Sequence, residues 1–140
     1  MKLTRYTDFA LRTMIHLAAR PEELSSIRAI AGAYGISQNH LMKVVNDLGH
    51  AGFVEAVRGR NGGIRLGRPA DQITLGEIVR HTEGHEKLVD CDGCLISPVC
   101  TLPRLLSEAT EAFMRSLDRY RLSDLVASPE QFRALLAIAE

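Results

Sequence analysis

The sequence has no tryptophan, few aromatic residues and no excess of charge of either sign. Its 17 basic and 17 acidic side chains give a formal net charge of +0, so any affinity for nucleic acid must come from local basic patches. No apolar run approaches the roughly 20 residues that a membrane-spanning helix needs, so we expect no membrane partner. With only 5 prolines and a hydrophobic share of 46%, the chain is typical of a globular protein rather than a disordered one.

The N-terminal segment lacks the continuous apolar stretch of a secretion signal, because Asp8, Arg12 and His16 interrupt it. Its apolar residues recur instead with helical spacing, which predicts a helix over 8–20 capped by Thr7 or Asp8. We therefore expect a cytoplasmic location. In that reducing compartment, closely spaced cysteines more often bind a metal or do redox chemistry than form a structural disulfide.

Residues 26–50 carry the pattern of a helix-turn-helix. Ser26 is placed to cap a first helix, Gly35 to end it in the left-handed conformation, and Ser37 to cap a second. The second helix gathers its apolar side chains on one face and leaves polar ones on the other. The apolar stripe consists of Leu41, Val44, Val45 and Leu48.

A predicted β-hairpin follows directly and would form the wing of a winged helix. One strand is expected over 53–57 and the returning strand over 64–66. Asn61 and Gly62 favour the positive φ angles of a tight turn between the strands. Arginines at the tip supply positive charge, and the glycines beside them let the backbone approach another surface closely.

These elements predict an α+β, mostly helical fold with a winged helix-turn-helix DNA-binding domain at residues 1–83. The start of the second helix would enter the major groove, and the arginines of the wing would reach the adjacent minor groove. The alternative is a small α+β core whose hairpin is only a hairpin and whose arginines are solvated. The candidate DNA-contacting residues are Arg5, Arg28, Ser37, Gln38, Asn39, His40, Lys43, Arg58, Gly59, Arg60, Asn61 and Gly62.

The C-terminal part, residues 101–140, is predicted to hold a long helix starting at Thr101 and a tail with short helical segments after Ser123 and Ser128. A shorter helix, capped by Thr74, precedes it. The apolar stripe of the long helix covers about five turns, roughly the width of a domain. We therefore expect it to pair with a second copy in a homodimer rather than to pack on its own domain. The stripe comprises Leu102, Leu105, Leu106, Ala109, Ala112, Phe113, Leu117 and Tyr120.

The only three cysteines, Cys91, Cys94 and Cys100, lie in a predicted loop over residues 84–100. Three thiolates and a nitrogen or oxygen ligand suit zinc, and the same soft ligands suit an iron–sulfur cluster. A redox pair of Cys91 and Cys94 is a third possibility, because C-x-x-C motifs lower thiol pKa values. Unliganded surface cysteines are a fourth. Nearby nitrogen and oxygen ligands are His81, His85, Asp90 and Asp92.

Three stretches resemble the NsrR-type nitric-oxide-sensitive repressors, winged-helix regulators whose family also includes the iron–sulfur assembly regulator IscR. They are "LTRYTDFALR", "NHLMKVVNDLGHAGFVEAVRGRNGGIRLGRPADQITLGEIVR", and the cysteine segment with "CLISPVCTL" and "AFMRSLDRYRLSDLV". The resemblance implies an iron–sulfur cluster, of 4Fe-4S or 2Fe-2S type, in a homodimer that represses genes for nitric oxide detoxification from a palindromic operator. Nitric oxide would attack the cluster iron, and the nitrosylated protein would release DNA.

The resemblance also implies a fourth ligand, because Asp8 matches an aspartate that completes the cluster from the other subunit in some NsrR-like proteins. The histidine that serves IscR-like members is replaced here by Pro103, which cannot ligate. The gap between Cys91 and Cys94 is shorter than relatives usually have, which brings the motif closer to a zinc or redox C-x-x-C. A regulator that reads iron supply or redox state through cluster loss is the alternative. A thiol enzyme would lack the βαβ context of thioredoxin-like proteins, and we expect no enzyme.

Overall fold

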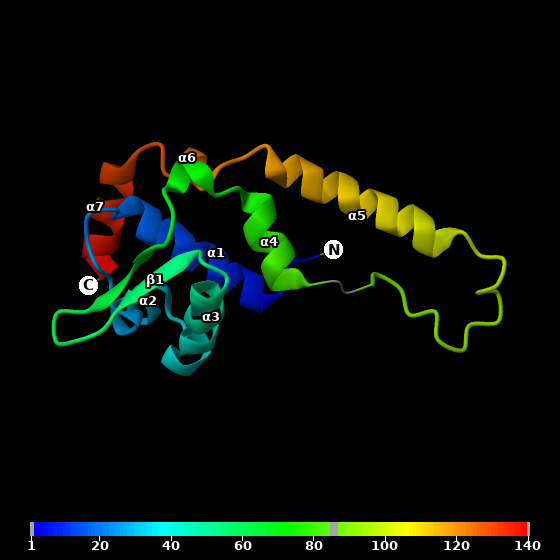
Figure 1. The fold of residues 1–140 in the computed structure, drawn as a ribbon, viewed down its shortest axis with the longest axis horizontal. Helices are drawn as coiled ribbons and strands as arrows, with labels where there is room; N and C mark the ends of the chain where they lie inside the picture. The colour runs from blue at the N-terminus through cyan, green and yellow to red at the C-terminus, as the bar shows by residue number, and fades with distance from the viewer. Residues whose placement is uncertain (1, 85–86, 140) are drawn as a thin grey trace.

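The computed structural model describes residues 2–84 and 87–139. Figure 1 shows a rounded body, which we define as residues 2–84 and 119–139, and an arm formed by residues 87–118. The mostly helical α+β class expected from the sequence is confirmed. The elements are α1 Arg5–Ala19, α2 Ile27–Tyr34, α3 Gln38–His50, β1 Val54–Val57, β2 Gly63–Leu66, η1 Ala70–Gln72, α4 Leu75–Glu83, α5 Leu102–Asp118, α6 Leu122–Leu125 and α7 Pro129–Ala139.

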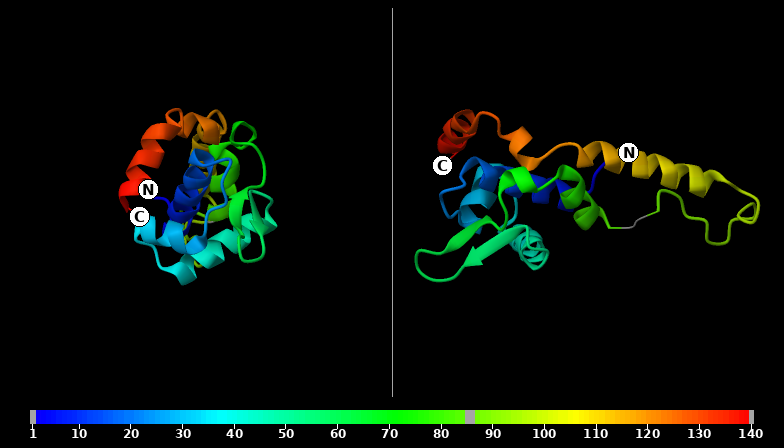
Figure 2. Two further views of the ribbon diagram at one scale, coloured as in Figure 1. Left: turned by 90° about the vertical axis from the view of Figure 1, so that its left-hand side faces the viewer. Right: turned by 45° about the horizontal axis from the view of Figure 1, so that its top comes forward.

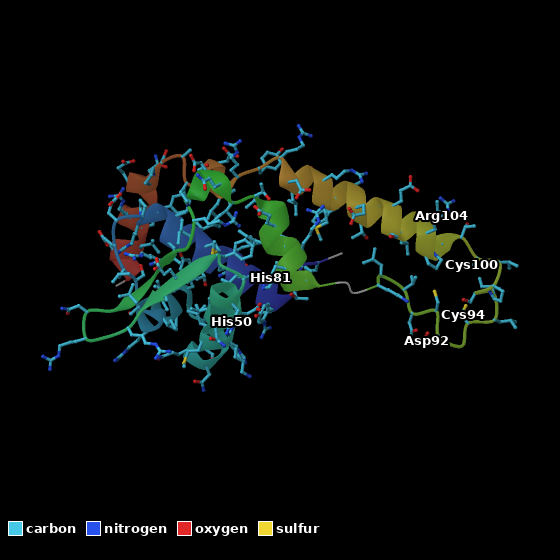
Figure 3. The ribbon with its side chains drawn as sticks, in the orientation of Figure 1. His50, His81, Asp92, Cys94, Cys100 and Arg104 are labelled. Carbon is cyan, nitrogen blue, oxygen red and sulfur yellow. The ribbon has the colours of Figure 1, made fainter. Side chains whose placement is uncertain are left out.

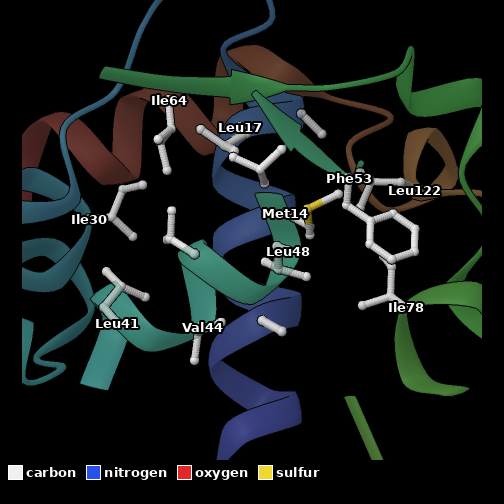
Figure 4. Close-up of a cluster of buried hydrophobic side chains, with 14 of the residues drawn as sticks. Met14, Leu17, Ile30, Leu41, Val44, Leu48, Phe53, Ile64, Ile78 and Leu122 are labelled. Carbon is white, nitrogen blue, oxygen red and sulfur yellow. The ribbon is translucent and has the colours of Figure 1, made fainter. Parts of the chain in front are cut away.

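The core of the body forms around α1, against which α3, α4, β2, α6 and α7 all pack. Met14 of α1, Leu48 of α3, Ile78 of α4 and Leu122 of α6 have no solvent exposure and meet in one cluster (Figure 4). Burying such a side chain contributes about 1.5–3 kcal/mol to the free energy of unfolding. The helical spacing of apolar residues therefore determines which face of each helix points inward.

The helix ends confirm part of the predicted capping. The backbone N–H of Ala29 donates to the Ser26 hydroxyl at 3.0 Å, and Gly35 ends α2 with a φ of 64°. Thr74 caps α4, with the reciprocal bond from its backbone N–H to Glu77 at 2.8 Å. Ser37 precedes α3 as expected, but its hydroxyl makes no capping hydrogen bond.

The predicted cap of α1 is wrong. The helix begins at Arg5, one turn earlier than expected, and Thr4 is its cap: the backbone N–H of Thr7 donates to the Thr4 hydroxyl at 3.2 Å. Thr7 is buried inside the helix, and the Asp8 carboxylate instead holds the side chain of Arg12. Contacts of Thr4 and Thr7 with the end of α4, described below, stabilise this extra turn.

The wing is an antiparallel hairpin in which Val54 pairs with Leu66 and Val57 with Gly63. The predicted tight turn at Asn61 and Gly62 is wrong, because residues 58–62 form a longer loop and neither Asn61 nor Gly62 has a positive φ. Gly59 has the positive φ, 115°, and its carbonyl accepts from the Gly62 N–H at 3.0 Å. Gly62 is required for space, since a Cβ there would collide with the Val57 carbonyl oxygen.

The chain leaves the body after α4, forms the arm, and then returns. Helix α5 packs against α4, where Arg80 binds Asp118 and lies 3.8 Å from Glu111. Backbone bonds from Leu122 N–H to the Ile73 carbonyl and from Leu75 N–H to the Tyr120 carbonyl then tie the returning chain to the start of α4. Helices α6 and α7 pack on α1, so the tail lies with the body (Figure 2).

None of the helices within the described ranges is both long enough and apolar enough to span a bilayer.

Candidate functional site

The start of α3 presents a polar surface to solvent. Its inward face is occupied by the four predicted apolar residues, all buried, which turns the opposite face outward. Ser37 and the first-turn residues Gln38, Asn39 and His40 are exposed, as is Lys43 one turn later. Amide, imidazole and ammonium groups of this kind are the side chains that meet base edges and phosphates in a major groove.

The wing tip lies on the same side of the body as α3, at the lower left of Figure 1. Arg58, Gly59, Arg60 and Asn61 are exposed, and Gly62 is partly exposed. Within residues 2–84 and 87–139, no carboxylate forms an ion pair with Arg58, Arg60 or Lys43. Their charges are therefore available to an anionic partner. The structure also brings the predicted residues of α3 and of the wing to one face of the body.

Arg65 provides a contrast within the same hairpin. Its side chain binds the Glu55 carboxylate of the neighbouring strand at 2.9 Å. That hydrogen bond, followed by the charge of Arg65, lowers the pKa of Glu55. The positive charge of the wing is thus compensated along its strands and uncompensated at its tip. The two remaining candidates, Arg5 and Arg28, are both exposed, at the start of α1 and in the first turn of α2.

The cysteine loop, residues 87–101, runs along the arm, and its labelled Cys94 and Cys100 lie at the far end (Figure 3). It is a series of tight turns: the Cys94 N–H donates to the Cys91 carbonyl at 3.2 Å, and the Cys100 N–H to the Ile96 carbonyl at 2.9 Å. All three cysteines are free thiols, Cys94 exposed and the other two partly so. Apolar side chains of the loop are also exposed, Leu95 at 94% and Val99 at 83%.

The other candidate metal ligands are distributed between the loop and the body. Asp90 and Asp92 lie in the loop, where the Asp90 carboxylate accepts from the Asp92 backbone N–H at 3.0 Å. His81 lies in the body, away from the labelled cysteines (Figure 3), and its ring contacts Asp47. Asp8 also belongs to the body, on α1, and is half exposed. His85 lies outside the described residues.

No three histidine, cysteine or carboxylate side chains in the described part of this single chain are grouped closely enough to hold a metal ion. The thiols nevertheless suit an iron–sulfur cluster, because three free cysteines share one short loop and thiolates are the usual ligands of such clusters. A fourth ligand from α1 would have to come from another chain, since α1 of this chain lies in the body and the cysteines at the end of the arm (Figures 1 and 3).

A group of polar contacts between α1, α3 and α4 was not predicted from the sequence, and we name it the polar junction. Tyr6 and His81 both contact the Asp47 carboxylate, the former at 2.7 Å through its hydroxyl and the latter at 3.1 Å through Nε2. The polar junction consists of Thr4, Tyr6, Thr7, Asp47, His81, Thr82 and Glu83.

The polar junction affects the ionisation of two of its members. Burial, reinforced by the hydrogen bond to Asp47 and its negative charge, raises the pKa of Tyr6 to about 12. The phenol therefore stays protonated at neutral pH and remains a hydrogen-bond donor to Asp47. Burial raises the pKa of Glu83, but its interactions with Thr7 and Thr4 outweigh this effect, and the pKa falls below its usual value. Glu83 is thus a charged acceptor for the start of α1.

Comparisons with known proteins agree with this geometry. The model of the Rrf2 family, whose description is "Iron-dependent Transcriptional regulator", matches residues 3–128. The HTH-type transcriptional regulator NsrR of Bacillus subtilis (strain 168) is 51% identical over 146 residues, with 100% of both chains covered. The solved structure of T. potens IscR is similar with a TM-score of 0.75 and 26% identity, over 94% of this chain and 90% of that one. CymR (YrzC), the global cysteine regulator of B. subtilis, gives a TM-score of 0.69 and 30% identity over 91% and 97%.

Proposed function

The chain belongs to the Rrf2 family of winged-helix transcriptional regulators, and from this premise we propose that it is an iron–sulfur repressor that releases operator DNA in response to nitric oxide. Its relatives are named transcriptional regulators, and the chain is a DNA-binding regulator rather than an enzyme. The observation that carries the proposal is the combination of an uncompensated basic face at α3 and the wing tip with a loop of three free thiols.

DNA binding would use the two parts of the basic face differently. Asn39 and its neighbours at the start of α3 project from a rigid helix, which suits base contacts in the major groove. Arg58 and Arg60 stand on the glycine-containing tip of the wing, which suits contacts with phosphates or with a narrow minor groove. Arg5 and Arg28 would add phosphate contacts.

We infer a homodimer because the arm leaves apolar side chains uncovered in a single chain. Leu102 and Leu105 of α5 are about half exposed, beside the exposed apolar residues of the cysteine loop. A second copy of α5 offers a face of the same chemistry, and a two-fold symmetric contact would also give two α3 helices for the half-sites of a palindromic operator.

The cluster would be held by Cys91, Cys94 and Cys100 of one chain, with Asp8 from the second chain as the fourth ligand. When bound, the cluster supplies iron with which nitric oxide reacts. The chain's own residues would convert this event into DNA release: the thiolates would fix the turns of the cysteine loop, and this loop comes after α4 in the chain. The end of α4 in turn contacts α1 and α3 through the polar junction.

Purification without oxygen tests the proposal. The protein should be brown, its visible absorption should fade on addition of nitric oxide, and the same addition should release a fluorescent operator duplex in an anisotropy titration. A Mössbauer spectrum would assign the cluster as 4Fe-4S or 2Fe-2S. Colourless protein with stoichiometric zinc would contradict the sensing mechanism and leave the DNA-binding assignment standing.

Sensing of iron supply or redox state through cluster loss is the second candidate function, favoured by the family's description as iron-dependent and by the short Cys91–Cys94 gap. The two functions differ in which reagent releases DNA. Parallel titrations with nitric oxide, an iron chelator and oxygen separate them. Release by the chelator without release by nitric oxide would select the second function.

A further inference from the structure

We propose that Asp47 is a positioning residue that couples the cysteine loop to the orientation of the recognition helix α3. This inference rests on the proposed function, since it concerns how a change at the loop reaches DNA. Its basis is the polar junction, where Asp47 is the member contributed by α3 and contacts both α1 and α4.

The first part of the polar junction joins α1 to α4. The Thr4 backbone N–H and hydroxyl both donate to one oxygen of Glu83, at 2.8 and 3.0 Å. The Thr7 hydroxyl donates to the Thr82 hydroxyl at 2.8 Å. The start of α1, where Asp8 lies, and the end of α4, where the chain leaves for the cysteine loop, are therefore fastened together. A change at either of these two points is expected to move the other.

The second part joins this pair of helix ends to α3. Each oxygen of the Asp47 carboxylate is used: Oδ2 accepts from the Tyr6 hydroxyl at 2.7 Å, and Oδ1 lies 3.1 Å from His81 Nε2. The His81 ring also packs edge-on against Phe53, with ring centroids 5.8 Å apart. The imidazole is thus held on two sides, which makes it a defined point of contact between α4 and α3.

The position of Asp47 along α3 gives this contact its effect. Asp47 lies near the C-terminal end of α3, and the DNA-facing residues 38–43 lie at the other end of the same helix. Because a helix of this length moves as a nearly rigid rod, a displacement at Asp47 changes the direction in which residues 38–43 project. Neither Asp47 nor its two partners need touch DNA for this role.

Asp47→Asn is the main test, since the amide keeps the shape of the carboxylate and removes its charge and one acceptor. The measured quantity is the ratio of the operator dissociation constants of cluster-free and cluster-loaded protein. We expect a wild-type ratio of about tenfold or more, as is usual for coupled sites, and a ratio within about twofold of one for Asp47→Asn. Tyr6→Phe removes one of the two contacts and should give an intermediate ratio.

Tyr34→Phe is the matched control, because its hydroxyl lies 3.4 Å from His16 Nδ1 and so connects α2 to α1 without involving α3 or α4. It should leave the ratio at the wild-type value. If Asp47 has only a structural role, Asp47→Asn should weaken both forms equally and leave the ratio unchanged, which would overturn the inference. Thermal unfolding checks that each variant folds. If Asp47→Asn does not fold, the binding ratio measured for Tyr6→Phe tests the inference instead.

Hydrogen exchange in cluster-free protein gives a readout that does not depend on the cluster. The backbone amides of residues 45–50 should exchange several-fold faster in Asp47→Asn and at the wild-type rate in Tyr34→Phe; unchanged exchange in Asp47→Asn would contradict the tie between α3 and α4. A wild-type ratio of one would instead contradict the proposed function, and the exchange result would then decide separately whether Asp47 holds α3.

Discussion

The body and the arm differ in how completely a single chain buries their apolar side chains. In the body, helices from both ends of the sequence enclose one core around α1, and residues such as Met14 and Leu48 have no exposure. In the arm, α5 buries Met114 against its neighbours but leaves Leu102 and Leu105 half exposed, and the cysteine loop exposes nearly all of Leu95. Since apolar burial is the main source of folding free energy, the body encloses its core within one chain, whereas the exposed apolar side chains of the arm suit contact with another chain.

Their polar groups differ in the same way. The body joins its helices through the polar junction and compensates the charge of Arg65 with Glu55. Among the described residues, no carboxylate pairs with Lys43 of α3 or with Arg58 and Arg60 of the wing tip. The arm carries three free thiols, and among the described residues of the same chain no group of three histidine, cysteine or carboxylate side chains is close enough to hold a metal ion. We infer that the body reads DNA and that the arm reads the signal, with the end of α4 as the connection between them.

The largest effect should come from comparing truncations of a leucine in the two regions. Leu48→Ala, in the core, should lower the free energy of unfolding by about 2–5 kcal/mol through lost burial and the cavity left behind. Leu105→Ala, on the arm, should change the unfolding of the body by less than about 0.5 kcal/mol and should raise the dissociation constant of the dimer. Urea denaturation and sedimentation measure the two quantities. If Leu105→Ala lowered the free energy of unfolding as much as Leu48→Ala, the arm would be part of the core.

A smaller effect distinguishes the compensated and uncompensated arginines of the wing. Arg60→Ala should weaken operator binding by about tenfold and, for a phosphate contact, reduce the slope of log affinity against log salt by about one. Arg65→Ala, whose side chain is held by Glu55, should leave the slope nearly unchanged. Anisotropy titrations over a range of salt concentrations provide both values.

The base contacts proposed for α3 need their own measurement. Asn39→Ala should alter which operator bases are preferred, because an amide that reads a base edge contributes about 1–3 kcal/mol of discrimination. Binding to a set of operators with single base changes reveals the preference. If Asn39→Ala lowers affinity equally for every sequence, Asn39 contacts the backbone rather than a base.

Helix caps within the body should differ by about 1 kcal/mol or less. Ser26→Ala removes the hydrogen bond to the Ala29 N–H and should reduce the free energy of unfolding by about 1 kcal/mol. Ser37→Ala removes no capping bond and should cost only a few tenths of that value. A larger cost at Ser37 than at Ser26, in the same urea titration, would contradict the capping seen here.

The smallest expected effect on stability is at Asp8. Its ion pair with Arg12, at 2.9 Å, is about half exposed on both sides, so Asp8→Ala should change the free energy of unfolding by only about 0.3–0.5 kcal/mol. The visible spectrum of the cluster-loaded protein should nevertheless change if Asp8 is a ligand. A spectrum identical to that of the wild type, with Arg12→Ala as the control for the ion pair, would remove Asp8 from the ligand set.

Much of the fold was predictable because its signals are local. The apolar stripe of α3, the caps Ser26 and Thr74, and the left-handed Gly35 each depend on residues within about one helical turn. The prediction for the wing had the strands right and the turn wrong, because the dipeptide Asn61-Gly62 is a statistical signal for a two-residue turn. In the loop that forms, Gly62 lies so close to the Val57 carbonyl that only glycine fits there.

The start of α1 shows where local signals are insufficient. Thr4, Thr7 and Asp8 are all acceptable caps by residue type. Thr4 is the cap in the structure, where it also donates two hydrogen bonds to Glu83 on another helix. The same limitation applies to the candidate site. Residue types identified the basic face and the thiols, but no spacing rule joins Tyr6, Asp47 and His81, since these three residues come from separate helices.

By itself, therefore, the sequence determined the helical and strand periods, the basic wing, and the presence of three thiols in one loop. Only the tertiary structure decided that the tail returns to α1, that the arm extends beyond the body and leaves Leu102 and Leu105 half exposed, and that Asp47 joins α3 to α1 and α4. The physical reason is distance along the chain: secondary structure depends on neighbours within a few residues, whereas these contacts form only once a shared core has brought distant helices together.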